Sequence, residues 1–168
     1  MRLTHLSVAL PPWILQLEAP DPILDRTMAR VRQNSPDFLV VTLDGRRMRE
    51  RASLFEQFAL LLSFPDYFGS TWNSFADCIQ DLTWFRAKGF VVAIREAQVL
   101  LEDGDPVEFG LFLRTAQETG ASFREEQLLH PSVPFHLLLQ AAPAHGGQLA
   151  KKIGQTGVPT SVLMEGQR

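Results

Sequence analysis

Three short, uninterrupted runs of apolar residues constrain the fold of this chain more than any other feature. They occupy residues 38–43 (Phe-Leu-Val-Val-Thr-Leu), 90–94 (Phe-Val-Val-Ala-Ile) and 135–139 (Phe-His-Leu-Leu-Leu). Because the runs are continuous rather than alternating with polar residues, they are typical of strands covered on both faces in a parallel sheet. Segments with helical periodicity lie between them, which is the α/β pattern. The sequence therefore predicts an α/β fold with a short three-stranded parallel sheet and helices packed around it.

Capping signals predict where the helices lie. One helix is expected to begin at Ser53, where Ser-Leu-Phe-Glu has the form of a capping box. A second is expected from Thr71 to Leu82. A later helix should begin after Asp105, an N-cap residue followed by proline, and end at Gly120.

The same signals divide the chain into a central domain, residues 37–142, and two flanking segments. Residues 1–36 carry prolines and an arginine-rich stretch and are interpreted as an N-terminal extension with one strand and one short helix. Residues 143–168 are rich in glycine, proline and glutamine and show no convincing periodicity. They are interpreted as a C-terminal tail, which this composition predicts to be mobile.

Composition argues against several classes of protein. The net charge of −3 lacks the basic excess typical of nucleic-acid binding. A lone cysteine, Cys78, leaves no disulfide framework and no cysteine-based zinc site. The stretch before Pro11 makes a poor signal peptide, and no apolar run approaches the roughly 20 residues that a membrane helix needs. The expectation is a soluble cytoplasmic protein without a metal, a cofactor or a membrane partner.

Charge is distributed unevenly along the chain. From Ala52 to Phe85 there is no lysine or arginine, and the four charged residues of this stretch are Glu56, Asp66, Asp77 and Asp81. An acidic face of this kind can steer a basic partner. The same acids are equally compatible with ordinary solvated helix surfaces.

Aromatic residues in the acidic stretch favour a binding surface. The segment 64–71 is a loop by its proline and glycine content, and it carries Phe64, Tyr67 and Phe68, of which Tyr67 is the only tyrosine of the chain. Trp72 follows at once. Tyrosine and tryptophan combine a large contact area with a polar tip, which suits them to protein interfaces.

Helical geometry sorts the side chains of the second helix. Phe75, Ile79 and Leu82 are spaced as a buried stripe, with Cys78 beside it. Asn73, Asp77 and Asp81 recur at every fourth position and form one polar row on another face. The sequence therefore predicts an outward row of polar and acidic groups next to an aromatic loop.

These residues resemble the barstar family. The stretch 64–78 (Phe-Pro-Asp-Tyr-Phe-Gly-Ser-Thr-Trp-Asn-Ser-Phe-Ala-Asp-Cys) is similar to its characteristic segment: proline, acid, two aromatics and glycine, then a helix with two acids four residues apart and a cysteine after the second. The resemblance implies a non-enzymatic intracellular inhibitor of the immunity type, which occludes the basic active site of a ribonuclease or related toxin. Asp77 would mimic an RNA phosphate. The implied partner-binding residues are Tyr67, Phe68, Gly69, Thr71, Trp72, Asn73, Ala76, Asp77, Gln80 and Asp81.

Two positions of this segment depart from the family pattern, and Thr115 and Thr119 of the later helix depart from it as well. Asn73 stands where the first helix acid is usual, and Ala76 stands where a large aromatic residue is common. Asp81 could restore part of the missing charge. These departures keep a second hypothesis open: a regulatory interaction module with the same fold, whose partner is not a ribonuclease.

Two rival functions have weaker sequence support. Catalysis would need tuned groups that converge in a pocket, but His5 and His145 lie in weakly patterned ends, and His136 lies within an apolar strand as expected of a core histidine. A fourth histidine, His130, adds no motif, and no glycine-rich phosphate loop is present. Nucleic-acid binding would rest on the arginines at positions 26, 30, 32, 46, 47, 49 and 51, and aromatic residues are not interleaved with them.

Overall fold

A parallel sheet runs through the molecule. The computed structural model describes residues 1–125 and 132–164. The strands lie in the order β2-β3-β4-β1-β5, and every neighbouring pair is parallel. Their bounds are β1 Ile14–Glu18, β2 Phe38–Asp44, β3 Gly89–Arg95, β4 Phe135–Ala141 and β5 Ser161–Val162.

The parallel α/β architecture is confirmed, and the three predicted runs form β2, β3 and β4. The predicted strand number was wrong, because the sheet has five strands rather than three. The additional strands come from the flanking segments: β1 inserts between β4 and β5, so that Ile14 pairs with Leu137 on one side and Leu15 with Ser161 on the other. All three predicted segments thus contribute to one sheet, and the division at residues 36 and 142 stays a prediction.

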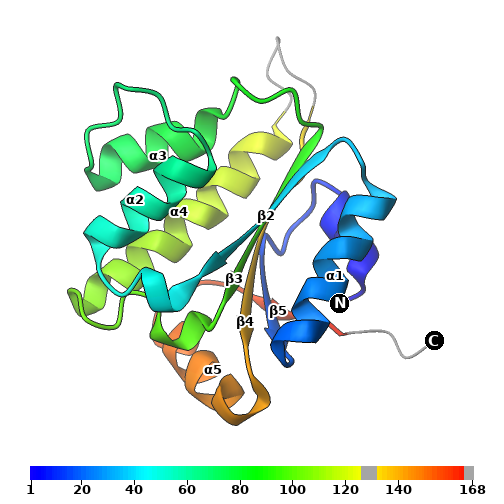
Figure 1. The fold of residues 1–168 in the computed structure, drawn as a ribbon, viewed down its shortest axis with the longest axis vertical. Coiled ribbons are helices and arrows are strands. Elements are labelled where there is room, and N and C mark those ends of the chain that lie inside the picture. The colour runs from blue at the N-terminus through cyan, green and yellow to red at the C-terminus, as the bar shows by residue number, and fades with distance from the viewer. Residues whose placement is uncertain (126–131, 165–168) are drawn as a thin grey trace.

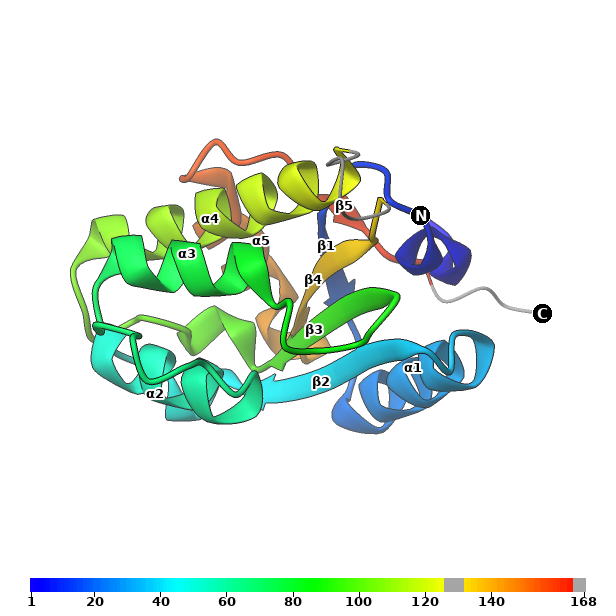
Figure 2. The same cartoon turned by 90° about the horizontal axis from the view of Figure 1, so that it is seen from above.

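Helices cover both faces of the sheet (Figure 1). On one face lie α2, α3 and α4, and on the other lies α1, as the view from above also shows (Figure 2). The bounds of the helices are α1 Asp21–Asn34, α2 Arg51–Leu61, α3 Trp72–Asp81, α4 Pro106–Arg124 and α5 Gly146–Gly154. Short 3-10 turns are η1 Leu3–Ser7, η2 Gly45–Arg47, η3 Ala97–Val99 and η4 Pro143–His145.

Successive strand residues point to two separate cores, as the pleat of a strand requires. Val92 and Leu137 join the larger core beneath α2, α3 and α4, where phenylalanines meet ring against ring: Phe58 lies 5.3 Å from Phe75 and 5.7 Å from Phe112, measured between ring centroids. Residues of opposite parity, such as Val91 and Leu138, join the smaller core under α1. Burial on both faces explains why these strands are continuous apolar runs.

Two predicted helix ends were wrong for identifiable reasons. Helix α2 begins at Arg51, because Glu50 is the N-cap residue and its N–H donates to Oγ of Ser53 at 3.3 Å. Helix α4 continues past Gly120 to Arg124. A Cβ at position 120 would lie 2.5 Å from the Trp13 ring, so this glycine permits close packing rather than ending the helix.

The N-terminal segment holds one strand, β1, and one helix, α1, as expected, although the helix has 14 residues and is not short. The C-terminal segment is more regular than expected. Although expected to lack periodic structure, it holds η4, α5 and β5, with Leu149 and Ile153 buried. Within residues 1–125 and 132–164, none of the helices combines the length and apolar character needed to cross a membrane.

Candidate partner-binding surface

The loop between α2 and α3 is held in place by its own backbone. Phe64 N–H donates to Ala59 O at 2.9 Å, and Phe68 N–H donates to Pro65 O at 2.9 Å. Ser63 and Ser70 bend the chain with positive φ values of 50° and 54°. These bonds and bends fix the direction of each ring in the loop.

The rings of this loop separate into inward and outward groups. Phe64 and Phe68 pack against each other with centroids 5.1 Å apart, and both rest on the larger core. Tyr67 points outward and is 65% exposed. Of the three aromatic side chains of the loop, Tyr67 is therefore the one most available to a partner, whereas Phe68 mainly supports the loop from below.

The start of α3 is fixed by a reciprocal cap. Ser74 N–H donates to Oγ1 of Thr71, and Thr71 N–H donates to Oγ of Ser74, each at 3.1 Å. The cap satisfies backbone donors that a helix start leaves free. It also fixes the residue at which α3 begins, while Phe75 and Ile79, packed in the larger core, determine which side of the helix faces solvent.

The two predicted faces of α3 are confirmed. Phe75, Cys78 and Ile79 are buried in the helix, and Leu82 is buried just after it. The polar row of Asn73, Asp77 and Asp81 is exposed. Ala76 and Gln80 are half-buried beside this row, and Gly69 is exposed at the loop. We call residues 67–81 the loop–helix surface.

The polar row is not neutralised from within. Among the ion pairs between described residues, none includes Asp77 or Asp81. Partial desolvation raises the pKa of Tyr67, and the nearby Asp81 and Asp77 carboxylates raise it further. Burial raises the pKa of the Cys78 thiol, as do the neighbouring Asp77 and Asp81 carboxylates, which keeps this buried cysteine protonated.

Trp72 is tied to the rest of the molecule. Its Nε1 donates to Oε1 of Glu108 at 3.4 Å, and its ring meets Phe55 at a centroid distance of 5.0 Å. Sequence reasoning missed Glu108, a buried acid that also lies 3.5 Å from Arg51. Because Trp72 and Glu108 are 36 residues apart, local periodicity gives no signal for this contact.

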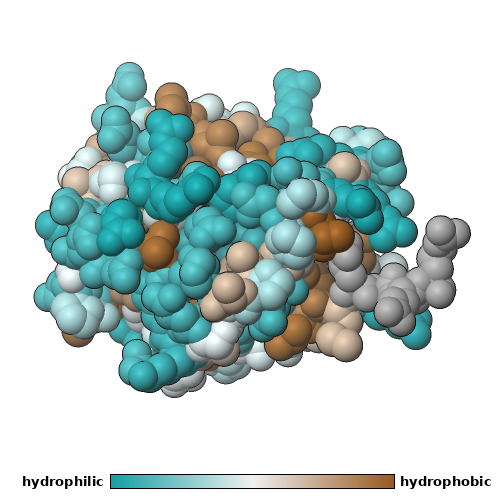
Figure 3. Space-filling model, turned by 60° about the horizontal axis from the view of Figure 1, so that its bottom comes forward, coloured by the Kyte–Doolittle hydropathy of each residue, from teal (hydrophilic) through white to brown (hydrophobic). Residues whose placement is uncertain are grey.

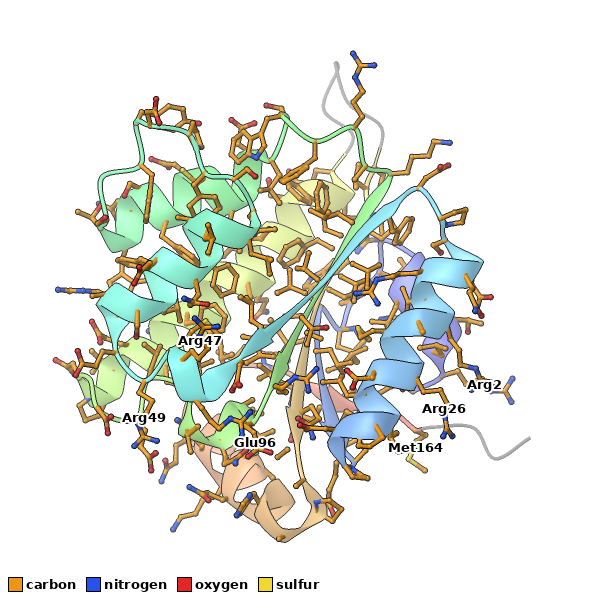
Figure 4. All side chains as sticks on the ribbon, in the orientation of Figure 1. Arg2, Arg26, Arg47, Arg49, Glu96 and Met164 are labelled. Atoms are coloured by element: carbon orange, nitrogen blue, oxygen red, sulfur yellow. The ribbon has the colours of Figure 1, made fainter. Side chains whose placement is uncertain are left out.

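The arginines between α1 and α2 are largely engaged with acceptors of this protein. Arg46 lies 2.7 Å from Asp44, and Arg49 lies 2.7 Å from Asp103. Arg32 donates to the Val40 carbonyl at 3.1 Å. Arg26 projects from α1, across the sheet from Arg49 (Figure 4). These groups therefore do not form one continuous basic face.

The histidines do not assemble into a catalytic group with Asp77. His136 Nε2 donates to the Val8 carbonyl at 2.9 Å, and burial lowers its pKa to about 4. The predicted core histidine is thus confirmed. The ring of His5 is tilted by 60° against that of His136 at a centroid distance of 5.0 Å, whereas His145 Nδ1 lies 3.2 Å from Gln98 Nε2. His130 lies outside the described residues.

Fold and surface together define a parallel α/β protein that presents an exposed, acidic loop–helix surface. The chain belongs to the Barstar family: the family model described as Barstar (barnase inhibitor) matches residues 38–140. The match includes the whole loop–helix surface, strands β2 and β3, and all of β4 except its last residue. Among curated proteins, no sequence matches this chain.

Solved structures resemble the chain over nearly its full length. Two structures of the Aeropyrum pernix ORC2 protein, one in the ADP form and one of ADPNP-ADP complexes, each align with a TM-score of 0.66 at 12% sequence identity. The alignments cover 96% of this chain but only 44% and 43% of the ORC2 chains. At this low identity, the likeness is one of fold alone.

Proposed function

We propose that this protein is a non-enzymatic inhibitor that covers the basic active site of a ribonuclease or related toxin with its loop–helix surface. The observation that carries the proposal is the placement of Asp77: it is exposed, has no ion-pair partner among the described residues, and lies on the family-matched part of the chain. A carboxylate without an internal partner is free to meet arginines of another protein.

The physical argument combines attraction with shape. Asp77 and Asp81 provide negative charge and hydrogen-bond acceptors that can occupy the place of RNA phosphates. Tyr67 provides a large ring beside them, which can fill an apolar recess of the partner. The Thr71–Ser74 cap and the inward-packed Phe68 hold this surface in one arrangement before binding, which lowers the entropy lost on association.

A second candidate function rests on the departures from the family pattern. Asn73 is exposed in the row that Asp77 and Asp81 continue, so the row carries two charges instead of three. Ala76 leaves a small side chain where the family commonly has a large ring. Both changes favour a partner with a less basic recognition site, and hence a regulatory interaction module whose partner is not a ribonuclease.

Nucleotide binding, which the ADP and ADPNP of the ORC2 structures suggest, has little support at the junction of β1 and α1. Phosphate loops join a strand to a helix with glycines and free backbone N–H groups. Here β1 is joined to α1 by Ala19 and Pro20, and α1 opens with Asp21 and Pro22. The prolines lack N–H donors, and the Asp21 carboxylate, 3.3 Å from Arg95, would repel a phosphate.

The proposal is tested by capture followed by measured binding. The wild-type protein, Asp77→Ala and Glu56→Ala are immobilised and exposed to a lysate, and the captured protein is identified, purified and assayed for ribonuclease activity. Glu56 is exposed on α2, outside the loop–helix surface, and gives the matched loss of one charge. We expect Asp77→Ala to weaken binding by about 3 kcal/mol, because a partner arginine would be left without its counter-charge.

The outcomes separate the two candidates. A captured ribonuclease that is inhibited by the wild type and not by Asp77→Ala supports the inhibitor. A captured protein without nuclease activity, still dependent on Asp77, supports the regulatory module. If Asp77→Ala and Glu56→Ala weaken binding equally, the loop–helix surface is not the binding site in either candidate function.

A further inference from the structure

A second candidate site lies away from the loop–helix surface. A cavity of about 590 Å³ opens between η3, the start of α4 and helix α5. It shares no residue with the loop–helix surface. The face turned forward in Figure 3, which includes the end of the molecule where α5 lies, is predominantly hydrophilic with separate hydrophobic patches.

Lys152 is the most informative group of the cavity lining. Its ammonium donates to the carbonyls of Gln98, at 3.0 Å, and Leu100, and it lies 4.6 Å from the centre of the Phe109 ring. An ammonium has three N–H donors, so one remains for another acceptor. No ion pair between described residues includes Lys152. A half-buried cation is therefore held at the cavity by backbone carbonyls, without an ion-pair partner among the described residues.

The charges around the cavity favour a negative ligand. Arg114 and Lys151 line it together with Lys152, and Glu102 is the one acid among the lining residues. Glu102 already lies 3.1 Å from Arg49, which faces it with a positive charge. Burial lowers the pKa of Lys152 by more than the neighbouring Glu102 carboxylate raises it, and the positive charge of Arg49 lowers it further.

The remaining lining residues suit an organic body rather than a bare ion. Leu101, Pro106, Val107 and Phe109 give the cavity an apolar side. Val107, the second residue of α4, is 60% exposed. Contact with water does not stabilise this apolar side chain. An aromatic or aliphatic group in the cavity would cover it.

We propose that this cavity binds a small organic anion, with a phosphate or carboxylate head placed against Lys152, Lys151 and Arg114 and an apolar body placed against Phe109 and Val107. The site is separate from the loop–helix surface and would hold whether or not the protein inhibits a ribonuclease. Its ligand would bridge α4 and α5 and so fix the C-terminal segment against the family-matched part of the chain.

The test uses phenyl phosphate as the probe, with inorganic phosphate and benzyl alcohol as the head alone and the body alone. Binding to the full chain is measured by isothermal titration calorimetry, and amide NMR shifts locate it. We expect saturable binding of phenyl phosphate, with shifts at Gly110 and Thr156, and weaker binding of both fragments. The double variant Arg114→Gln, Lys151→Gln should bind about tenfold more weakly, because each lost cation removes a charge-assisted hydrogen bond.

The matched control removes the same number of positive charges as the cavity double variant. Arg26→Gln with Arg30→Gln removes two exposed cations from α1, outside the cavity, and should leave binding unchanged. Asp77→Ala should also bind the probe normally, which separates this site from the proposed inhibitor function. Binding that falls equally in both double variants, or shifts confined to residues outside the cavity, would overturn the proposal.

Discussion

Glu108 joins the first turns of three helices through a single buried carboxylate. Its Oε1 accepts a hydrogen bond from Nε1 of Trp72, the first residue of α3, at 3.4 Å. Arg51, the first residue of α2, approaches the same oxygen at 3.5 Å. The start of the proposed binding helix is thereby fixed both to α2, which precedes it along the chain, and to α4, which follows only after β3 and η3.

Removal of this carboxylate should destabilise the protein. Glu108→Ala leaves the Trp72 indole and the Arg51 guanidinium without their acceptor, and we expect the free energy of unfolding to fall by about 2 kcal/mol. Urea unfolding followed by tryptophan fluorescence measures the change. Glu118→Ala, at an exposed position of the same helix, should have little effect; similar losses for the two variants would contradict the joining role of Glu108.

Addition of one acid to the polar row should strengthen charge steering. We expect Asn73→Asp to speed association with a barnase-type ribonuclease at low ionic strength, and the gain should shrink as salt is added. Stopped-flow mixing over a series of salt concentrations measures the rate. An unchanged rate at low salt would indicate that enzymes of this type are not the target.

Acid should destabilise the fold through His136. Burial lowers its pKa from 6.5 to about 4, so between these pH values the unfolded chain binds a proton that the folded protein does not. The contribution of this neutral imidazole is complete above pH 6.5 and is lost as the pH falls toward 4, by about 3 kcal/mol in total.

The contribution of His136 is isolated by comparing unfolding free energies across this pH range. His136→Asn should lose less stability on acidification than the wild type, whereas His145→Asn, at an exposed position, should follow the wild type. The prediction fails if the wild type and His136→Asn show the same dependence on pH.

Gly45 should tolerate no side chain. It is buried directly after β2, and a Cβ there would lie 2.5 Å from the carbonyl oxygen of Glu96, which is backbone and cannot rotate away. We expect Gly45→Ala to lower the free energy of unfolding by about 2 kcal/mol. Gly147→Ala, where a Cβ meets nothing within 4 Å, provides the control and should be neutral or slightly stabilising. Thermal unfolding of both variants measures the difference.

The sequence predicts the strands with long apolar runs well and the short strand β5 poorly, for a physical reason. Strands β3 and β4 are buried on both faces, and the edge strand β2 places Leu43 in the larger core and Val40 in the smaller one, so continuous apolar runs mark all three in the sequence. Strand β5 is two residues long, Ser161–Val162, and its pairing with β1 is decided by tertiary packing rather than by its own composition. Helix α5 opens with Gly146 and Gly147, residues that disfavour helix, and only Leu149 and Ile153 mark its buried stripe.

The candidate surface also has features that the sequence predicts and features that it does not. The faces of α3 follow from helical geometry, so the exposure of Asp77 could be predicted from spacing alone. The direction of the loop rings could not, because Ser63 and Ser70 adopt positive φ values that serine does not signal. The anchoring of Trp72 depends on a contact between distant segments, which periodicity cannot reveal.

The place of β1 in the sheet has a consequence for synthesis on the ribosome. Ile14 is synthesised long before its partner Leu137, which belongs to a much later segment of the chain. Until Leu137 has been made, β1 has open backbone groups and an apolar surface that other nascent chains could occupy. A chain trimmed to residues 38–140 would lack β1 altogether and leave the β4 edge of the sheet bare, and we expect it to aggregate more readily than the chain of residues 1–168.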